Sequence, residues 1–158
     1  MKLLVYSLLV FVLFVLGYNY YEQFFLYSKS LLELENLSLD KRSITDKNNG
    51  AIVLGIVLAT LPLFYLVIRK TTNLNSILGQ GTSIFLIVVF GVLFWRLRIF
   101  GLNEEFRKLT DYVDSFQTVP NVEIEYLKFD IYVLMGFIVG ALIAILLFRD
   151  KSKPLLGN

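Results

Sequence analysis

The chain has 158 residues, of which 56% are hydrophobic and 18% charged, and its mean hydropathy is +0.67. A soluble domain typically has about 45–50% apolar and about 25% charged residues, so this class is excluded. The sequence contains neither His nor Cys. This composition excludes Cys/His zinc sites, iron–sulfur clusters, disulfides and Ser–His or Cys–His catalysis. The net charge of +2 is too small to indicate nucleic-acid binding, and we expect no metal and no cofactor.

Four apolar segments are each long enough to cross a bilayer as a helix, which takes about 20 predominantly apolar residues. They cover approximately residues 3–21, 51–68, 81–100 and 131–148. Backbone polar groups in lipid must be satisfied within the segment, so each span is expected to be helical. We therefore predict an all-α integral membrane protein whose residues 1–158 form a single membrane domain. A cleaved signal peptide is the alternative for the first span, but a retained helix is expected.

The distribution of basic residues predicts how the spans are oriented. The N-terminus, the loop 69–80 and the tail 149–158 together carry a net charge of +5. The rest of the chain, which includes the segments 22–50 and 101–130, carries a net charge of −3. Lys and Arg favour the cytoplasmic side, so both termini are expected in the cytoplasm and the two long segments outside it. The expected location is the cytoplasmic (inner) membrane of a bacterium, with an organellar membrane as the alternative.

The segments 22–50 and 101–130 are predicted to form a small, mostly helical extracytoplasmic cap. Apolar residues at helical spacing continue the first and third spans into it, namely Phe24, Tyr27, Leu31 and Leu34, and Phe106, Leu109, Val113 and Phe116. Asn48-Asn49-Gly50 indicates a turn back to the membrane. Apolar and polar residues alternate at 37–39 and 122–126, which favours two short strands that pair above the membrane. In the alternative, residues 122–127 form the first turn of the fourth helix.

An ionisable residue inside a membrane span is the main indicator of a functional site in such proteins. Arg96 and Arg98 lie at the outer end of the third span. We expect Arg96 within the outer leaflet, paired with Glu22 or with Glu104 and Glu105, and Arg98 nearer to water. This group is a candidate site for an anionic lipid headgroup or an ion pair. Snorkelling of both side chains to lipid phosphates is the alternative.

Small residues four positions apart predict close contacts between helices. They are Gly136, Gly140 and Ala144 in the fourth span, and Gly55 and Ala59 in the second. Without a bulky side chain, two backbones approach closely enough for dispersion forces to hold them together in lipid. The pattern does not say whether the partner helix belongs to the same chain.

Pro62 lies inside the second span. Proline lacks a backbone N–H, so it frees the carbonyl near Leu58 and bends the helix. The resulting kink is a candidate hinge for gating. A purely structural kink that improves packing is the alternative.

The two halves of the chain have a similar construction. Residues of one half recur 80 to 85 positions later in the other: Gly17, Asn36, Gly55, Ala59 and Arg69 match Gly101, Asn121, Gly136, Gly140 and Arg149. A parallel duplication of two helical hairpins would produce this pattern. Chance similarity among apolar helices is the alternative.

The sequence shows no catalytic motif, so we expect no enzymatic activity and no small-molecule substrate. These features favour a small accessory or scaffold subunit of a larger membrane complex. Its expected partners are membrane lipid and other membrane protein subunits or further copies of itself. Two alternatives remain: a homo-oligomeric channel with a hydrophobic gate, and a sensor or immunity-type protein that binds another membrane protein.

Overall fold

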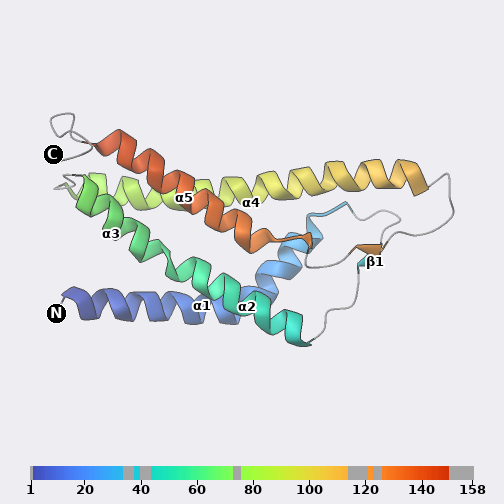
Figure 1. Cartoon of the computed structure of the whole chain (residues 1–158), viewed down its shortest axis with the longest axis horizontal. Helices are drawn as coiled ribbons and strands as arrows, with labels where there is room; N and C mark the ends of the chain where they lie inside the picture. The colour runs from blue at the N-terminus through green and yellow to red at the C-terminus, as the bar shows by residue number, and fades with distance from the viewer. Residues whose placement is uncertain are drawn as a thin grey trace, which may run out of the picture.

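The computed structural model describes residues 2–33, 38–39, 44–72, 76–113, 121–122 and 126–149. Its elements, in chain order, are α1 (Lys2–Ser30), β1 (Ser38–Leu39), α2 (Ile44–Ala59), α3 (Leu61–Thr71), α4 (Ile77–Val113), β2 (Asn121–Val122) and α5 (Phe129–Phe148) (Figure 1). Four stretches in this part of the chain are long and apolar enough to cross a membrane. They are Leu4–Ser30, Asn48–Thr71, Ile77–Leu109 and Phe129–Phe148. The prediction of four helices long and apolar enough to cross a membrane is therefore confirmed.

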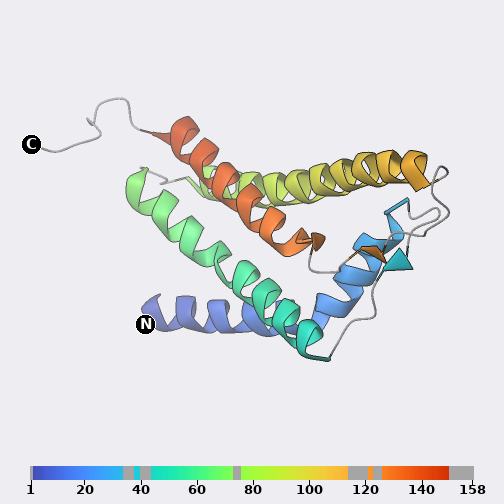
Figure 2. The same cartoon turned by 45° about the vertical axis from the view of Figure 1, so that its right-hand side comes forward.

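Successive spans run in opposite directions along the long axis of the molecule. The start of α1, the end of α3, the start of α4 and the end of α5 lie at one end, which we call the terminal end (Figure 1). The opposite end, where β1 and β2 lie, is the cap end. The pairs α1–α2 and α4–α5 form the two most extensive helix interfaces. Between these hairpins α2 and α3 run diagonally, from α1 at the cap end toward α4 and α5 at the terminal end (Figures 1 and 2).

The third span continues as one helix into the cap, as predicted. Helix α4 has 37 residues. At 1.5 Å per residue it is about 55 Å long, well beyond a hydrocarbon core of about 30 Å. Its final turns carry the charged run Glu104 to Lys108, with an ion pair of 3.1 Å between Glu104 and Arg107. The predicted stripe residue Phe116 lies outside the described residues.

Helix α1 is shorter than predicted, because it ends at Ser30 and a turn follows at Leu31 and Leu32. A side chain from α4 accounts for this end. Asn103 donates its Nδ2 to the Leu31 carbonyl (3.2 Å) and accepts the Glu33 N–H at its Oδ1 (3.1 Å). These bonds satisfy backbone groups that a longer helix would pair internally. Leu34 lies outside the described residues.

The predicted turn at Asn48-Asn49-Gly50 is wrong, because all three residues lie within α2. The glycine has a packing role instead. The phenol ring of Tyr21, from α1, occupies the space that a side chain on Gly50 would take. Close contact between the two helices therefore explains this glycine, and tertiary packing overrides the weak helix propensity of the segment.

At the cap end the two half-chains meet in a short parallel ladder. Ser38 pairs with Asn121, and Leu39 with Val122. The alternative that residues 122–127 begin the fourth helix is wrong, because α5 starts at Phe129. Lys128, just before it, has a left-handed backbone (φ 46°, ψ 36°) that interrupts any helix from the preceding residues. Residues 123–125 and Leu37 lie outside the described residues.

Aromatic side chains join the cap-end half of α1 to the α4–α5 hairpin. The Trp95 ring lies 6.0 Å from Phe24 and 5.9 Å from Tyr27, measured between ring centroids. The ring centroids of Phe25 and Phe129 lie 6.2 Å apart. Buried residues of α4, including Leu102 and Phe106, complete this core. These aromatic contacts join the two hairpins at the cap end, and α3 contacts α4 and α5 toward the terminal end (Figure 1).

Candidate functional site

The most unusual group in the structure is a buried arginine at the cap end of the bundle. Arg98 lies on α4 and is only 9% exposed. Its Nε donates to the carbonyl of Leu127 (3.1 Å) and its Nη2 to that of Tyr126 (2.7 Å). Both carbonyls belong to the turn that leads into α5. A buried charge is costly unless hydrogen bonds and opposite charges compensate it, and here the planar guanidinium bonds two successive carbonyls.

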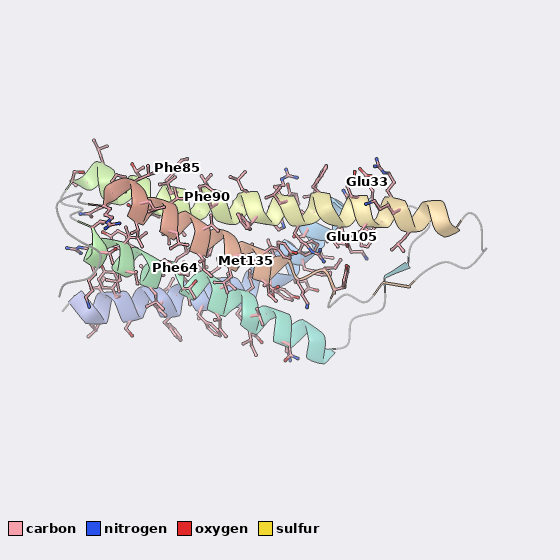
Figure 3. The ribbon with its side chains drawn as sticks, turned by 45° about the horizontal axis from the view of Figure 1, so that its top comes forward. Glu33, Phe64, Phe85, Phe90, Glu105 and Met135 are labelled. Atoms are coloured by element: carbon pink, nitrogen blue, oxygen red, sulfur yellow. The ribbon has the colours of Figure 1, made fainter. Side chains whose placement is uncertain are left out.

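Three further side chains surround this guanidinium. Its central carbon lies 5.1 Å from the ring centroids of both Tyr126 and Tyr132, which is cation–π distance. The Glu105 carboxylate lies 3.8 Å from Nη1 and also accepts a hydrogen bond from the Tyr126 hydroxyl (3.0 Å). Figure 3 shows Glu105 and Glu33 at the cap end, away from Phe64, Phe85, Phe90 and Met135. We call Arg98, Glu105, Tyr126, Leu127 and Tyr132 the Arg98 cluster.

The structure places the two arginines on different faces of α4. Arg96 is exposed and its guanidinium lies 5.3 Å from the Trp95 ring, whereas Arg98 is buried inside the chain. Residues two apart on a helix point in different directions. Glu105, predicted as a partner of Arg96, pairs instead with Arg98. Glu22 is exposed on α1.

Helical spacing would have identified the buried arginine. Counting back from Phe106 in steps of four gives Leu102 and then Arg98, all on the face that packs inward. The predicted stripe of apolar residues at helical spacing began at Phe106 and was not followed back toward the start of the helix. Since the guanidinium bonds carbonyls of its own chain, the Arg98 cluster serves to fasten the turn before α5 to α4.

A second polar connection joins α1 to α4. The Trp95 indole N–H donates to the Ser28 hydroxyl (3.0 Å), which in turn donates to the carbonyl of Phe24 (2.7 Å). Ser28 has no exposed surface, so both groups are satisfied inside the protein. Neither Ser28 nor Asn103 was predicted as a contact residue, because a single polar residue in a sequence does not reveal its partner on another helix.

The small residues of the fourth span face α4 of the same chain. A methyl group built on Gly140 would lie 2.7 Å from Cα of Ile87 and 2.8 Å from the Leu86 carbonyl oxygen. One on Gly136 would overlap the Phe90 carbonyl oxygen. Ala144, the third member of the motif, has no exposed surface. This face therefore holds α4 and α5 together.

The small residues of the second span lie toward the first. A methyl group on Gly17 would be 2.7 Å from Cα of Gly55, and one on Gly55 would be 2.9 Å from the Phe14 carbonyl oxygen. Ala59, one turn further, is also buried. Gly17 was not predicted as a packing residue, nor was Gly91, over which the Phe137 ring lies. Neither has a second small residue four positions away, so the pattern did not reveal them.

Pro62 lies where the second span is interrupted. Helix α2 ends at Ala59, Thr60 forms a turn, and α3 begins with Pro62 in its first turn. The Thr60 hydroxyl donates to the Val57 carbonyl (2.6 Å). Pro62 is buried and lines an apolar cavity of about 320 Å³ between α1, α3 and α4.

Across the described part of the chain, no group of three or more acidic side chains is placed to hold a metal ion. No protein-family model matches this chain, and neither the curated proteins nor the solved structures include a significant match to it. The polar contacts described above all join one part of the chain to another. They position helices, and the apolar surfaces that these helices present are the remaining features from which a function is inferred.

Proposed function

We propose that this protein is a non-catalytic accessory or scaffold subunit of a larger membrane complex. The proposal rests on one observation: the other helices of the chain bury only a small part of α1. In the most apolar window of the first span 11% of the residues are buried, against 39% in the second span. Large apolar side chains, including Leu8 and Phe11, cover the exposed surface of α1. This surface supports contacts with other membrane helices.

Size-exclusion chromatography and native mass measurement after mild-detergent extraction test this proposal. We expect a stable assembly with unrelated chains in fixed stoichiometry. Phe11→Ala should release the partner without changing the melting temperature of the isolated chain. Leu93→Ala, at an equally apolar exposed position on α4, is the matched control. A ring of identical subunits would instead indicate the channel, and a transient one-to-one complex the sensor or immunity-type protein.

We also infer that both termini face the cytoplasm, in the cytoplasmic membrane of a bacterium. Arg69 and Lys70, at the end of α3, and Arg149, after α5, are basic residues that flank spans at the terminal end (Figure 1). This grouping on one end of the bundle supports the orientation, since cytoplasmic flanks are enriched in Lys and Arg.

Cysteine labelling in intact cells tests the orientation, because the sequence contains no native Cys. Glu33 and Ser76 are both exposed. Glu33 follows the end of α1 and Ser76 precedes the start of α4, and these two helix ends lie at opposite ends of the bundle (Figure 1). A membrane-impermeant maleimide should label Glu33→Cys and leave Ser76→Cys unlabelled until the cells are broken. Labelling of Ser76→Cys in intact cells, with Glu33→Cys protected, would show the opposite orientation.

A duplication of two helical hairpins is also proposed. Each half forms a hairpin whose helices come close at glycines, Gly17 with Gly55 and Gly91 with Gly136. The parallel ladder of β1 and β2 supports a repeat, because its paired residues are separated by the same interval as the recurring residues. Gly101 does not share the role of Gly17, because no atom of another described helix lies within 4 Å of a methyl group built on it.

A further inference from the structure

The apolar cavity at Pro62 lies where the first helix separates from the diagonal span. Toward the terminal end α1 and α3 move apart, because α3 turns to α4 and α5 (Figures 1 and 2). The cavity of about 320 Å³ is lined by Leu9 and Leu13 of α1, Pro62 of α3, and Ile84 and Ile87 of α4. Its volume lies at the lower end of the range for small-ligand sites, about 300–1,000 Å³.

Polar and basic groups stand at the terminal end of this cavity. Tyr6 and Tyr65 also line it. The Tyr6 hydroxyl accepts a hydrogen bond from Nη1 of Arg69 (3.4 Å), and the Tyr65 hydroxyl donates to Oε1 of Gln80 (3.0 Å). Arg69 is exposed, as is its neighbour Lys70. The cavity therefore combines apolar walls with a positively charged mouth, at the end of a span where lipid phosphates lie.

The lining of this space favours a hydrocarbon chain with a charged group at one end. From Tyr6 to Leu13 the cavity extends over about 10 Å of helix. Apolar walls are the environment that a hydrocarbon chain requires, and the arginine at the mouth suits a phosphate at the end of that chain.

We propose that this cavity binds one acyl chain of an anionic phospholipid, taken from the leaflet at the terminal end. The chain lies between α1, α3 and α4 and reaches Pro62. The phosphate receives hydrogen bonds from Arg69 and the Tyr6 hydroxyl, since arginine bonds phosphate oxygens through a planar pair of donors. The proposal depends on membrane insertion of these helices and is independent of the identity of any protein partner.

Native mass spectrometry of the purified chain in mild detergent tests the headgroup contact. The probes are phosphatidylglycerol and phosphatidylcholine with identical acyl chains. Both lipids carry the phosphate, but the choline cation of phosphatidylcholine would lie beside the basic mouth and be repelled by it. We therefore expect one molecule of phosphatidylglycerol to bind about three- to tenfold more tightly than one of phosphatidylcholine. Arg69→Ala should remove this preference, and Lys70→Ala, one position along the same helix, should retain it. Equal affinity of the unmodified chain for both lipids would overturn the proposal.

A second pair of variants tests the cavity. Leu9→Trp fills it and should abolish tight binding of phosphatidylglycerol. Leu8→Trp, the same change on a neighbouring side chain that does not line the cavity, should not. Far-UV circular dichroism checks that each variant is folded, and Ile84→Phe fills the same cavity from α4 if Leu9→Trp does not fold. Unchanged binding in a folded cavity-filling variant would contradict acyl-chain binding. If inorganic phosphate competes for the site as effectively as phosphatidylglycerol does, the site recognises phosphate alone, and acyl-chain binding would be contradicted.

Discussion

Gly136→Ala is expected to lower the free energy of unfolding by about 1–3 kcal/mol, the cost of overpacking a close contact. The added methyl group would overlap the carbonyl oxygen of Phe90 and Cα of Gly91. Both are backbone atoms of α4, so no side chain can rotate to make room and the two helices must separate. Trp95, the only tryptophan of the sequence and a buried one, reports the loss of packing through its fluorescence during chemical unfolding in detergent.

Gly101→Ala provides the matched control. It makes the same change within α4, at a position where no atom of another described helix lies within 4 Å of the new methyl group. We expect unchanged stability or a gain of up to about 1 kcal/mol, because alanine has the higher helix propensity. If both variants unfold alike, the close approach of α4 and α5 at Gly136 is not present in the protein.

The sequence was sufficient to predict the spans and one partner in each close helix contact. Apolar length determines which segments can cross a bilayer, and the spacing of Gly136, Gly140 and Ala144 marks a narrow face on α5. Such a motif needs two small residues on the same helix. Gly91 contributes a single small residue to the opposite helix, so only the structure reveals it.

The bounds of the helices in the cap depended on contacts between distant segments. Gly50 was predicted to form a turn, but the Tyr21 ring packs on it within a helix. The end of α1 depends on hydrogen bonds from Asn103, far along the chain. Local residue preferences carry no information about such partners, which explains why these two predictions failed. The cavity at Pro62 has the same origin, because it requires the relative positions of three helices.

The two arginines were assigned by their distance from the end of the apolar stretch. Depth in the membrane and helical face are separate properties, and the prediction used only the first. Arg98 shares its face with Leu102 and Phe106, whereas Arg96 is turned outward. The stripe that these apolar residues form was therefore the more informative pattern.

Arg98→Ala is expected to lower the free energy of unfolding by about 2–4 kcal/mol. The change removes two charge-assisted hydrogen bonds and leaves the carbonyls of Tyr126 and Leu127 without their donor. Arg98→Lys should restore only part of this loss, because an ammonium group cannot bond both carbonyls with the same planar geometry. Far-UV circular dichroism during thermal unfolding in detergent measures both changes.

Arg96→Ala is the control for Arg98→Ala. It separates the loss of the hydrogen bonds of a buried arginine from the general effect of removing a positive charge. Its guanidinium is exposed and lies against the Trp95 ring, a contact worth about 0.5–1 kcal/mol. We therefore expect a loss below about 1 kcal/mol, within the range of ordinary surface changes. Circular dichroism is the appropriate measurement here, because removing a cation from the Trp95 ring alters its fluorescence directly. If Arg96→Ala destabilises the protein as much as Arg98→Ala, the positive charge in this part of α4 stabilises the fold, and the hydrogen bonds from Arg98 to the turn before α5 do not.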